Sequence, residues 1–93
     1  MSNQKKDIQI KFPEDMQRGV YSNNAMVAHT RDEFIMDFML VTPPQGSVVS
    51  RVITSPGHMK RMLMAMQDNL AKYERKFGQI AVGEGPPVKG FSD

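Results

Sequence analysis

The sequence predicts a single α+β domain: an antiparallel sheet of three to four strands, followed by one long amphipathic helix packed on one face of the sheet. Three observations lead to this class. Residues 7–54 contain stretches in which apolar and polar residues alternate, short polar turns separate these stretches, and residues 55–78 carry an apolar stripe at helical spacing. A chain of 93 residues has room for one hydrophobic core.

The domain is expected to span residues 7–80, between two flexible tails. Residues 1–6 are almost entirely polar, and residues 81–93 contain a Gly-Glu-Gly-Pro-Pro run that neither a helix nor a central strand accepts. Ordering the second tail costs more backbone entropy than its few apolar side chains return on burial. A folded unit this small has a marginal core, which favours association with a second copy.

Residues 7–12 form the first predicted strand, because Ile8, Ile10 and Phe12 alternate with polar residues and a proline follows. Residues 19–29 alternate more weakly and predict a second strand, in which a pair of asparagines is unfavourable. A short polar connector then leads to the most regular strand of the chain.

That strand covers residues 33–41 and is apolar on both faces. A Thr-Pro-Pro-Gln-Gly turn at residues 42–46 follows, because two prolines cannot pair in a ladder, and residues 47–54 alternate again. The short connections make these strands antiparallel neighbours. The side chains expected to face the helix are those of Phe34, Met36, Phe38 and Leu40.

The helix is expected to begin after Ser55, an N-cap residue, with Pro56 at its first position and Gly78 at its C-terminal cap. At 1.5 Å per residue it is about 33 Å long, enough to lie along one face of the sheet. Its apolar stripe consists of Met59, Met62, Leu63, Met66, Leu70, Tyr73 and Phe77.

One helix covers one face, and the opposite face of the sheet is also apolar. A soluble monomer tolerates few such patches, so we expect a second copy of the chain to cover this one. The alternative is that the N-terminal segment or the C-terminal tail folds back over it. The residues expected at this oligomer or partner interface are Ile35, Met39, Val41, Val49 and Ile53.

Asp37 stands between apolar neighbours on that second face. A carboxylate buried alone there would be costly, and Arg51 on the next strand is a cross-strand partner within reach. A paired or rim-exposed charge is therefore favoured over an acid with a raised pKa.

Methionine is unusually frequent, with nine residues in the chain, four of them between Met59 and Met66. Methionine fills irregular gaps in a core, which is its commoner role, and it also forms adaptable binding surfaces. Both interpretations stay open.

Signals of catalysis are weak. The chain has no cysteine, His29 and His58 are its only histidines, and neither lies in a metal-binding spacing. No Gly-x-Ser-x-Gly elbow accompanies the serines. We therefore expect a non-enzymatic protein without cofactor or metal. The absence of a long apolar run and of a signal peptide predicts a cytoplasmic protein without a membrane span.

The net charge of +2 gives no strong nucleic-acid signal, but cations gather on the helix. Lys72, Arg75 and Lys76 lie in its last turns, where they serve either as a solvated face or as phosphate contacts. Nucleic-acid binding by these residues is the alternative to a protein-interaction function.

The chain resembles a family of small prokaryotic proteins of unknown function over about residues 8–80. The resemblance implies a fold and no known activity. The matching motifs are Val20-Tyr21-Ser22-Asn23, His29-Thr30-x-x-Glu33-Phe34-x-x-Asp37-Phe38, Ser50-Arg51-Val52-Ile53-x-Ser55-Pro56-x-His58 and Gln67-Asp68-Asn69-Leu70-x-x-Tyr73-Glu74-x-x-Phe77-Gly78.

In the order of its elements the chain is also similar to the export chaperone SecB, a cytoplasmic dimer of dimers that holds unfolded chains. This chain lacks the acidic surface of SecB. Together these points predict a homo-oligomeric interaction module, with chaperone-like binding of protein segments through the apolar sheet face and the methionine-rich helix.

Overall fold

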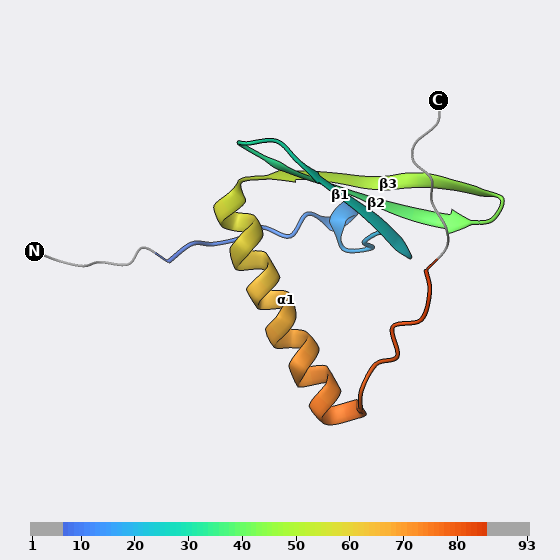
Figure 1. The fold of residues 1–93 in the computed structure, drawn as a ribbon. Coiled ribbons are helices and arrows are strands. Elements are labelled where there is room, and N and C mark those ends of the chain that lie inside the picture. Colours follow the sequence, from blue (N-terminus) through green and yellow to red (C-terminus); the bar gives the residue numbers. More distant parts are fainter. Residues whose placement is uncertain (1–6, 86–93) are drawn as a thin grey trace, which may run out of the picture.

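The structure, a computed structural model, describes residues 7–85. Its elements in chain order are the 3-10 helix η1 (Glu14–Met16), strands β1 (Asn24–His29), β2 (Phe34–Thr42) and β3 (Gln45–Thr54), and helix α1 (Pro56–Phe77). The strands form one three-stranded antiparallel sheet in the order β1-β2-β3, and α1 follows β3 directly (Figure 1). The predicted class and order of elements are confirmed.

The strand predicted at residues 7–12 is wrong for this chain on its own. In Figure 1 the segment runs outward from the sheet, and it pairs with no strand among residues 7–85. The weak second strand is shortened to β1, because Gly19 has a φ of 67° and belongs to the loop before it. Residues 78–85 contain no helix or strand, and the tail residues 1–6 and 86–93 lie outside the described residues.

Two tight turns join the strands. Between β1 and β2, the backbone N–H of Thr30 donates to the carbonyl of Glu33 at 2.9 Å, and the Thr30 hydroxyl accepts from Asp32 and Glu33. Between β2 and β3 the turn is shorter than predicted, because Thr42 pairs with Gln45 and only the two prolines lie outside the ladder.

One irregularity interrupts the β2–β3 ladder. Phe38 pairs with Ser50 and Met39 with Val48, so Val49 is an extra residue on β3. Such a β-bulge shifts the alternation of the strand by one place. On a given face of the sheet, β3 therefore contributes even-numbered residues on one side of Val49 and odd-numbered residues on the other.

The ends of α1 match the prediction. The Ser55 hydroxyl accepts from the backbone N–H of His58 at 3.2 Å, with Pro56 in the first turn. Gly78 ends the helix at a φ of 95°, and its N–H donates to the carbonyl of Glu74. The carboxylate of Glu74 also accepts from the N–H of Ile80 at 2.8 Å, which fixes the chain just beyond the helix.

The position of α1 differs from the prediction. The helix does not lie along a face of the sheet but leaves the end of β3 and points away from it (Figure 1). No residue of α1 is buried, although Met59 and Met62 in its first turns are half-buried. The radius of gyration is 17.2 Å, whereas a compact chain of this length has about 12 Å.

The core of the single chain is small. Among the described residues, Met36 and Met39 of the central strand are the buried hydrophobic side chains, and Asp37 is the buried charged one. Apolar residues on β1, β3 and α1 remain largely exposed. The single chain thus lacks most of the buried surface on which small domains depend.

Candidate interaction surfaces

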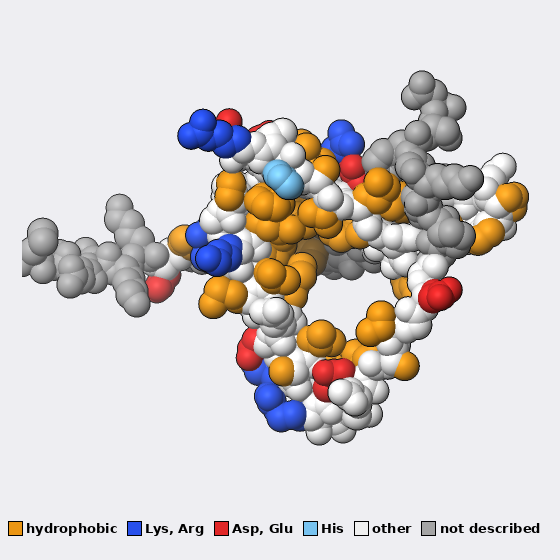
Figure 2. All heavy atoms as spheres, in the orientation of Figure 1, with side chains coloured by type: hydrophobic (Ala, Val, Ile, Leu, Met, Phe, Trp, Pro, Cys, Tyr) orange, Lys and Arg blue, Asp and Glu red, His pale blue; other side chains and the backbone are white. Residues whose placement is uncertain are grey.

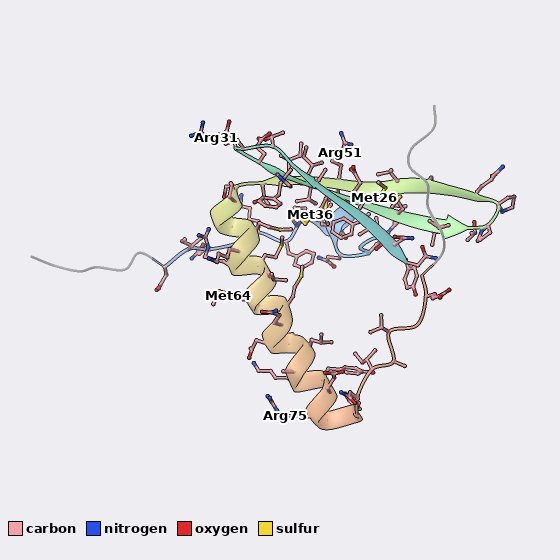
Figure 3. All side chains as sticks on the ribbon, viewed as in Figure 1. Met26, Arg31, Met36, Arg51, Met64 and Arg75 are labelled. Carbon is pink, nitrogen blue, oxygen red and sulfur yellow. The ribbon has the colours of Figure 1, made fainter. Side chains whose placement is uncertain are left out.

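The register assigns each strand residue to one of two faces. Val27 of β1 and Val52 of β3 flank Met36 on what we call the inner face, while Met26 and Arg51 flank Asp37 on the outer face. Figure 3 shows Met36 on the side of the sheet toward α1 and Arg51 on the opposite side. Met36 and Asp37 thus lie on opposite faces of β2, as the alternation of the strand predicts.

Asp37 is held by a bidentate ion pair across β2 and β3. The Arg51 Nε donates to Asp37 Oδ1 at 2.6 Å and an Arg51 terminal nitrogen donates to Oδ2 at 2.9 Å. The carboxylate is nearly buried, while most of the Arg51 side chain stays in solvent. Hydrogen bonding to Arg51 lowers the pKa of Asp37. The predicted cross-strand pair is confirmed, and an acid with a raised pKa is excluded at this position.

The five residues predicted at the interface behave differently from one another. Ile35 and Ile53 are direct cross-strand neighbours on the outer face, half-buried and exposed respectively. Val41 is half-buried on the same face. Met39 is buried within the chain and Val49 is the half-buried bulge residue, with Val48 taking the place opposite Met39. Of these five residues, Ile35 and Ile53 therefore form a continuous apolar surface that stays accessible.

The larger apolar surface is the stripe on α1, which we call the helix stripe. Its side chains are 49–65% exposed, although they are spaced for burial, and Figure 2 shows apolar side chains along the side of α1 that faces the sheet and residues 78–85. The rings of Tyr73 and Phe77 meet at a tilt of 47°, with centroids 5.0 Å apart. The residues of the helix stripe are Leu63, Met66, Leu70, Tyr73 and Phe77.

The methionines of α1 divide between two environments. Met59 and Met62 are half-buried, whereas Met64 and Met66 are exposed. Figure 3 places Met64 on the side of α1 away from the sheet, opposite to the helix stripe. Core filling and an exposed, adaptable surface thus both occur in this segment.

The predicted phosphate contacts lie at the end of α1, and two of the three have partners. Lys72 forms an ion pair with Asp68 at 3.0 Å, and the Lys76 ammonium lies 5.2 Å from the centre of the Phe77 ring. Arg75 points outward in Figure 3 and has no ion-pair partner among residues 7–85. The charge of Lys72 is thus partly offset by Asp68, whereas Lys76 and Arg75 keep their positive charge.

His29 and His58 lie on different elements, at the end of β1 and in the first turn of α1. His29 lies against the ring of Phe34, with centroids 5.5 Å apart. Within the described residues, no three His, Asp or Glu side chains come together as metal ligands. None of the helices described for residues 7–85 combines the length and apolar character needed to cross a lipid bilayer.

Sequence reasoning missed the role of Asn23. Its side-chain amide donates to the carbonyl of Val41 and accepts from the N–H of Val41, both at 2.8 Å, while its own backbone N–H donates to the carbonyl of Met39. The side chain thus continues the β1–β2 ladder beyond the strand. An asparagine within an alternating stretch was the one available signal.

A family model described as "Protein of unknown function (DUF3467)" matches residues 1–82 of the chain. Nothing matches among curated proteins or among solved structures. The predicted resemblance to a family without known activity is confirmed, and the resemblance to SecB gains no support from these comparisons.

Proposed function

The chain belongs to the family described as "Protein of unknown function (DUF3467)", and we propose that it is a non-enzymatic, homo-oligomeric protein-interaction module. The helix stripe carries this proposal. Helix α1 has 22 residues and an apolar face, yet none of its residues is buried. Its apolar face therefore lacks a surface against which to pack among residues 7–85. In water, most of the stability of such a helix comes from that packing.

The magnitude of the unburied surface supports association. Burying a large apolar side chain completely contributes about 1.5–3 kcal/mol, so completing the burial of a half-exposed one contributes about 1 kcal/mol. The five residues of the helix stripe would together contribute about 5 kcal/mol per subunit. This equals the lower end of the total stability of an ordinary domain, about 5–15 kcal/mol. A second copy offers the same stripe in return, and closed symmetric pairs are the commonest oligomers.

The test compares two methionines on opposite sides of α1. Met66 belongs to the helix stripe and Met64 does not, because two residues along a helix turn the side chain by about 200°. They are 52% and 64% exposed in the single chain, so a lysine at either position meets solvent there. Light scattering after size exclusion at tens of micromolar should give a dimer or larger species for the wild type and for Met64→Lys, and a smaller one for Met66→Lys.

Two results would contradict the proposal. One is a strictly monomeric wild type at these concentrations, and the other is an identical molar mass for both lysine variants and the wild type. Ile53→Lys tests the outer face in the same assay, because Ile53 is exposed. Met39→Lys is unsuitable, since Met39 is buried within its own subunit and a charge there would unfold it.

Binding of other protein segments forms a further part of the proposal. Exposed methionines adapt to differently shaped apolar partners. Met64, on the side of α1 opposite the helix stripe, would stay accessible in a dimer paired through that stripe. The oligomer is expected to slow the aggregation of a heat-denatured model protein, and Met64→Lys is expected to weaken this effect without changing the molar mass. If the wild type leaves the aggregation of the model protein unchanged, the chaperone-like role is refuted and the proposed oligomer is not.

Nucleic-acid binding would be the competing outcome. A gel shift with DNA or RNA at 50 mM salt that is lost in the triple variant Lys72→Ala, Arg75→Ala, Lys76→Ala would favour it. The ion pair of Lys72 with Asp68 lowers the positive charge that this surface offers to a phosphate.

A further inference from the structure

Residues 7–12 have the sequence of a strand but pair with no strand among residues 7–85. Ile8, Ile10 and Phe12 alternate with polar residues, and all three side chains are largely exposed, Ile10 at 86%. Among residues 7–85, the backbone of this segment makes no hydrogen bond to another backbone group. A segment of this kind buries its apolar side and pairs its backbone when it joins the edge of a sheet.

The sheet has two edges, and they differ in protection. β3 carries the bulge at Val49 and the charged Arg51, two features that discourage pairing with another chain. β1 contains no proline and no lysine, arginine or carboxylate, and it pairs with β2 without a shift in register. The N–H of Ala25 already donates to the side chain of Asn24 at 2.8 Å, so a further strand would pair with β1 at residues 26–29.

The segment is placed to reach another subunit rather than its own β1. In Figure 1, residues 7–12 run outward from η1 and leave the sheet. Extended chain advances about 3.3 Å per residue, so six residues reach about 20 Å beyond the subunit. The oligomer proposed above supplies a second sheet within such reach.

Resting on that oligomer, we propose that residues 7–12 of one subunit add to the outer edge of β1, at residues 26–29, in a second subunit as a fourth strand. In a two-fold pair the exchange is reciprocal. The apolar side of the segment lies on the inner face beside Val27, because the outer face carries the Asp37–Arg51 ion pair. The proposed strand accounts for the alternation at residues 7–12, which the single subunit leaves unused.

The natural absence of cysteine makes this arrangement directly testable by cross-linking. Val27 of β1 and Val52 of β3 flank Met36 from opposite sides of the same face, and they are 57% and 41% exposed. Val27→Cys and Val52→Cys are therefore matched reporters of the two edges. Tagged subunits that carry Ile10→Cys are mixed with untagged subunits that carry one reporter, so that subunits exchange between oligomers. The mixture is then treated with a bismaleimide cross-linker. Its reach of about 8 Å covers direct and diagonal cross-strand neighbours.

The expected result is at least ten times more covalent heterodimer with Val27→Cys than with Val52→Cys. Equal yields, a preference for Val52→Cys, or no heterodimer from an intact oligomer would overturn the inference while leaving the proposed oligomer in place. A wild type that is monomeric throughout would overturn both. A double variant with Ile10→Cys and Val27→Cys in one chain, diluted into wild type, would show an intramolecular product if the segment instead folds onto its own β1.

Dissociation constants supply a second readout in the full-length chain. Ile10→Lys places a charge on the apolar side of the added strand, whereas Gln9→Lys places the same charge on its polar side. Ile10→Lys should raise the dissociation constant of the oligomer at least tenfold, about 1.4 kcal/mol, and Gln9→Lys less than threefold. Equal effects of the two substitutions would contradict the pairing.

Discussion

Replacing Asn23 by alanine removes a side chain that acts as an extra rung of the sheet. Its amide makes two 2.8 Å hydrogen bonds with the backbone of Val41, one as donor and one as acceptor. Alanine at this position keeps the backbone of residue 23, whose N–H donates to the carbonyl of Met39. The variant therefore tests the side-chain bonds alone.

The loss can be assigned a magnitude. A protein hydrogen bond contributes a net of about 0.5–1.5 kcal/mol, and exposed bonds lie toward the lower value because water replaces the lost partner. Two such bonds give about 1–1.5 kcal/mol. A destabilisation of 1 kcal/mol lowers the midpoint of a domain this size by about 4–8 °C, so Asn23→Ala should lower it by about 5–10 °C.

The measurement is thermal unfolding followed by circular dichroism. Protein concentration must be the same for every variant, because association changes the apparent midpoint. Ser22→Ala is the control, since Ser22 is the adjacent residue and makes no side-chain hydrogen bond among the described residues. If Asn23→Ala lowers the midpoint no further than Ser22→Ala does, the Asn23 side chain does not stabilise the ladder.

Three further predictions follow from single contacts. Arg51 lowers the folded-state pKa of Asp37, so the ion pair contributes its full stability above the ordinary pKa of 3.8 and loses it as the pH falls below 3.8. Urea midpoints measured from pH 7 to pH 3 should therefore decline less for Asp37→Asn than for the wild type. A chain ending at Ile80 should keep its thermal midpoint within about 4 °C of the full-length value, and a larger drop would show that residues 81–93 are docked. Ser55→Ala should cost about 1 kcal/mol through loss of the helix cap, measured by urea unfolding, with the exposed Ser47→Ala showing no comparable loss.

The sequence predicts the boundaries of α1 well, because local chemistry decides them. Ser55 accepts from a backbone N–H whatever lies around the helix, and Gly78 adopts a positive φ that other residues resist. The same holds for β2, a run of mostly apolar residues that ends at the turn containing Pro43 and Pro44. Elements fixed by their own residues are those that a single sequence reveals.

Partners are harder to predict than elements. The alternation at residues 7–12 indicates which side chains share a face but not which edge, or which subunit, the strand joins. The stripe of α1 likewise predicts packing without identifying the opposing surface. Both failures arise because a pattern specifies a buried face, while the choice of partner depends on surfaces elsewhere.

Two details of the candidate surfaces depend on geometry that periodicity does not contain. The predicted interface included Val49 because strict alternation placed it with Ile53, but the bulge breaks that alternation. Met39 was expected at the surface because one face of the strand was assumed to be open, and the structure buries it. The Asp37–Arg51 pair was predictable, since opposite charges on neighbouring strands prefer to face each other.

The extra residue in β3 also governs how the chain tolerates changes in length. Ser50 and Val48 already face consecutive residues of β2, so deleting Val49 leaves every other pair of the hairpin in place and makes the ladder continuous. Deleting Val52 instead would move Arg51 to the opposite face and separate it from Asp37. Chains related by descent can therefore differ by one residue at Val49 and keep the same hairpin and ion pair, and an alignment gap there marks a lost bulge rather than a changed fold.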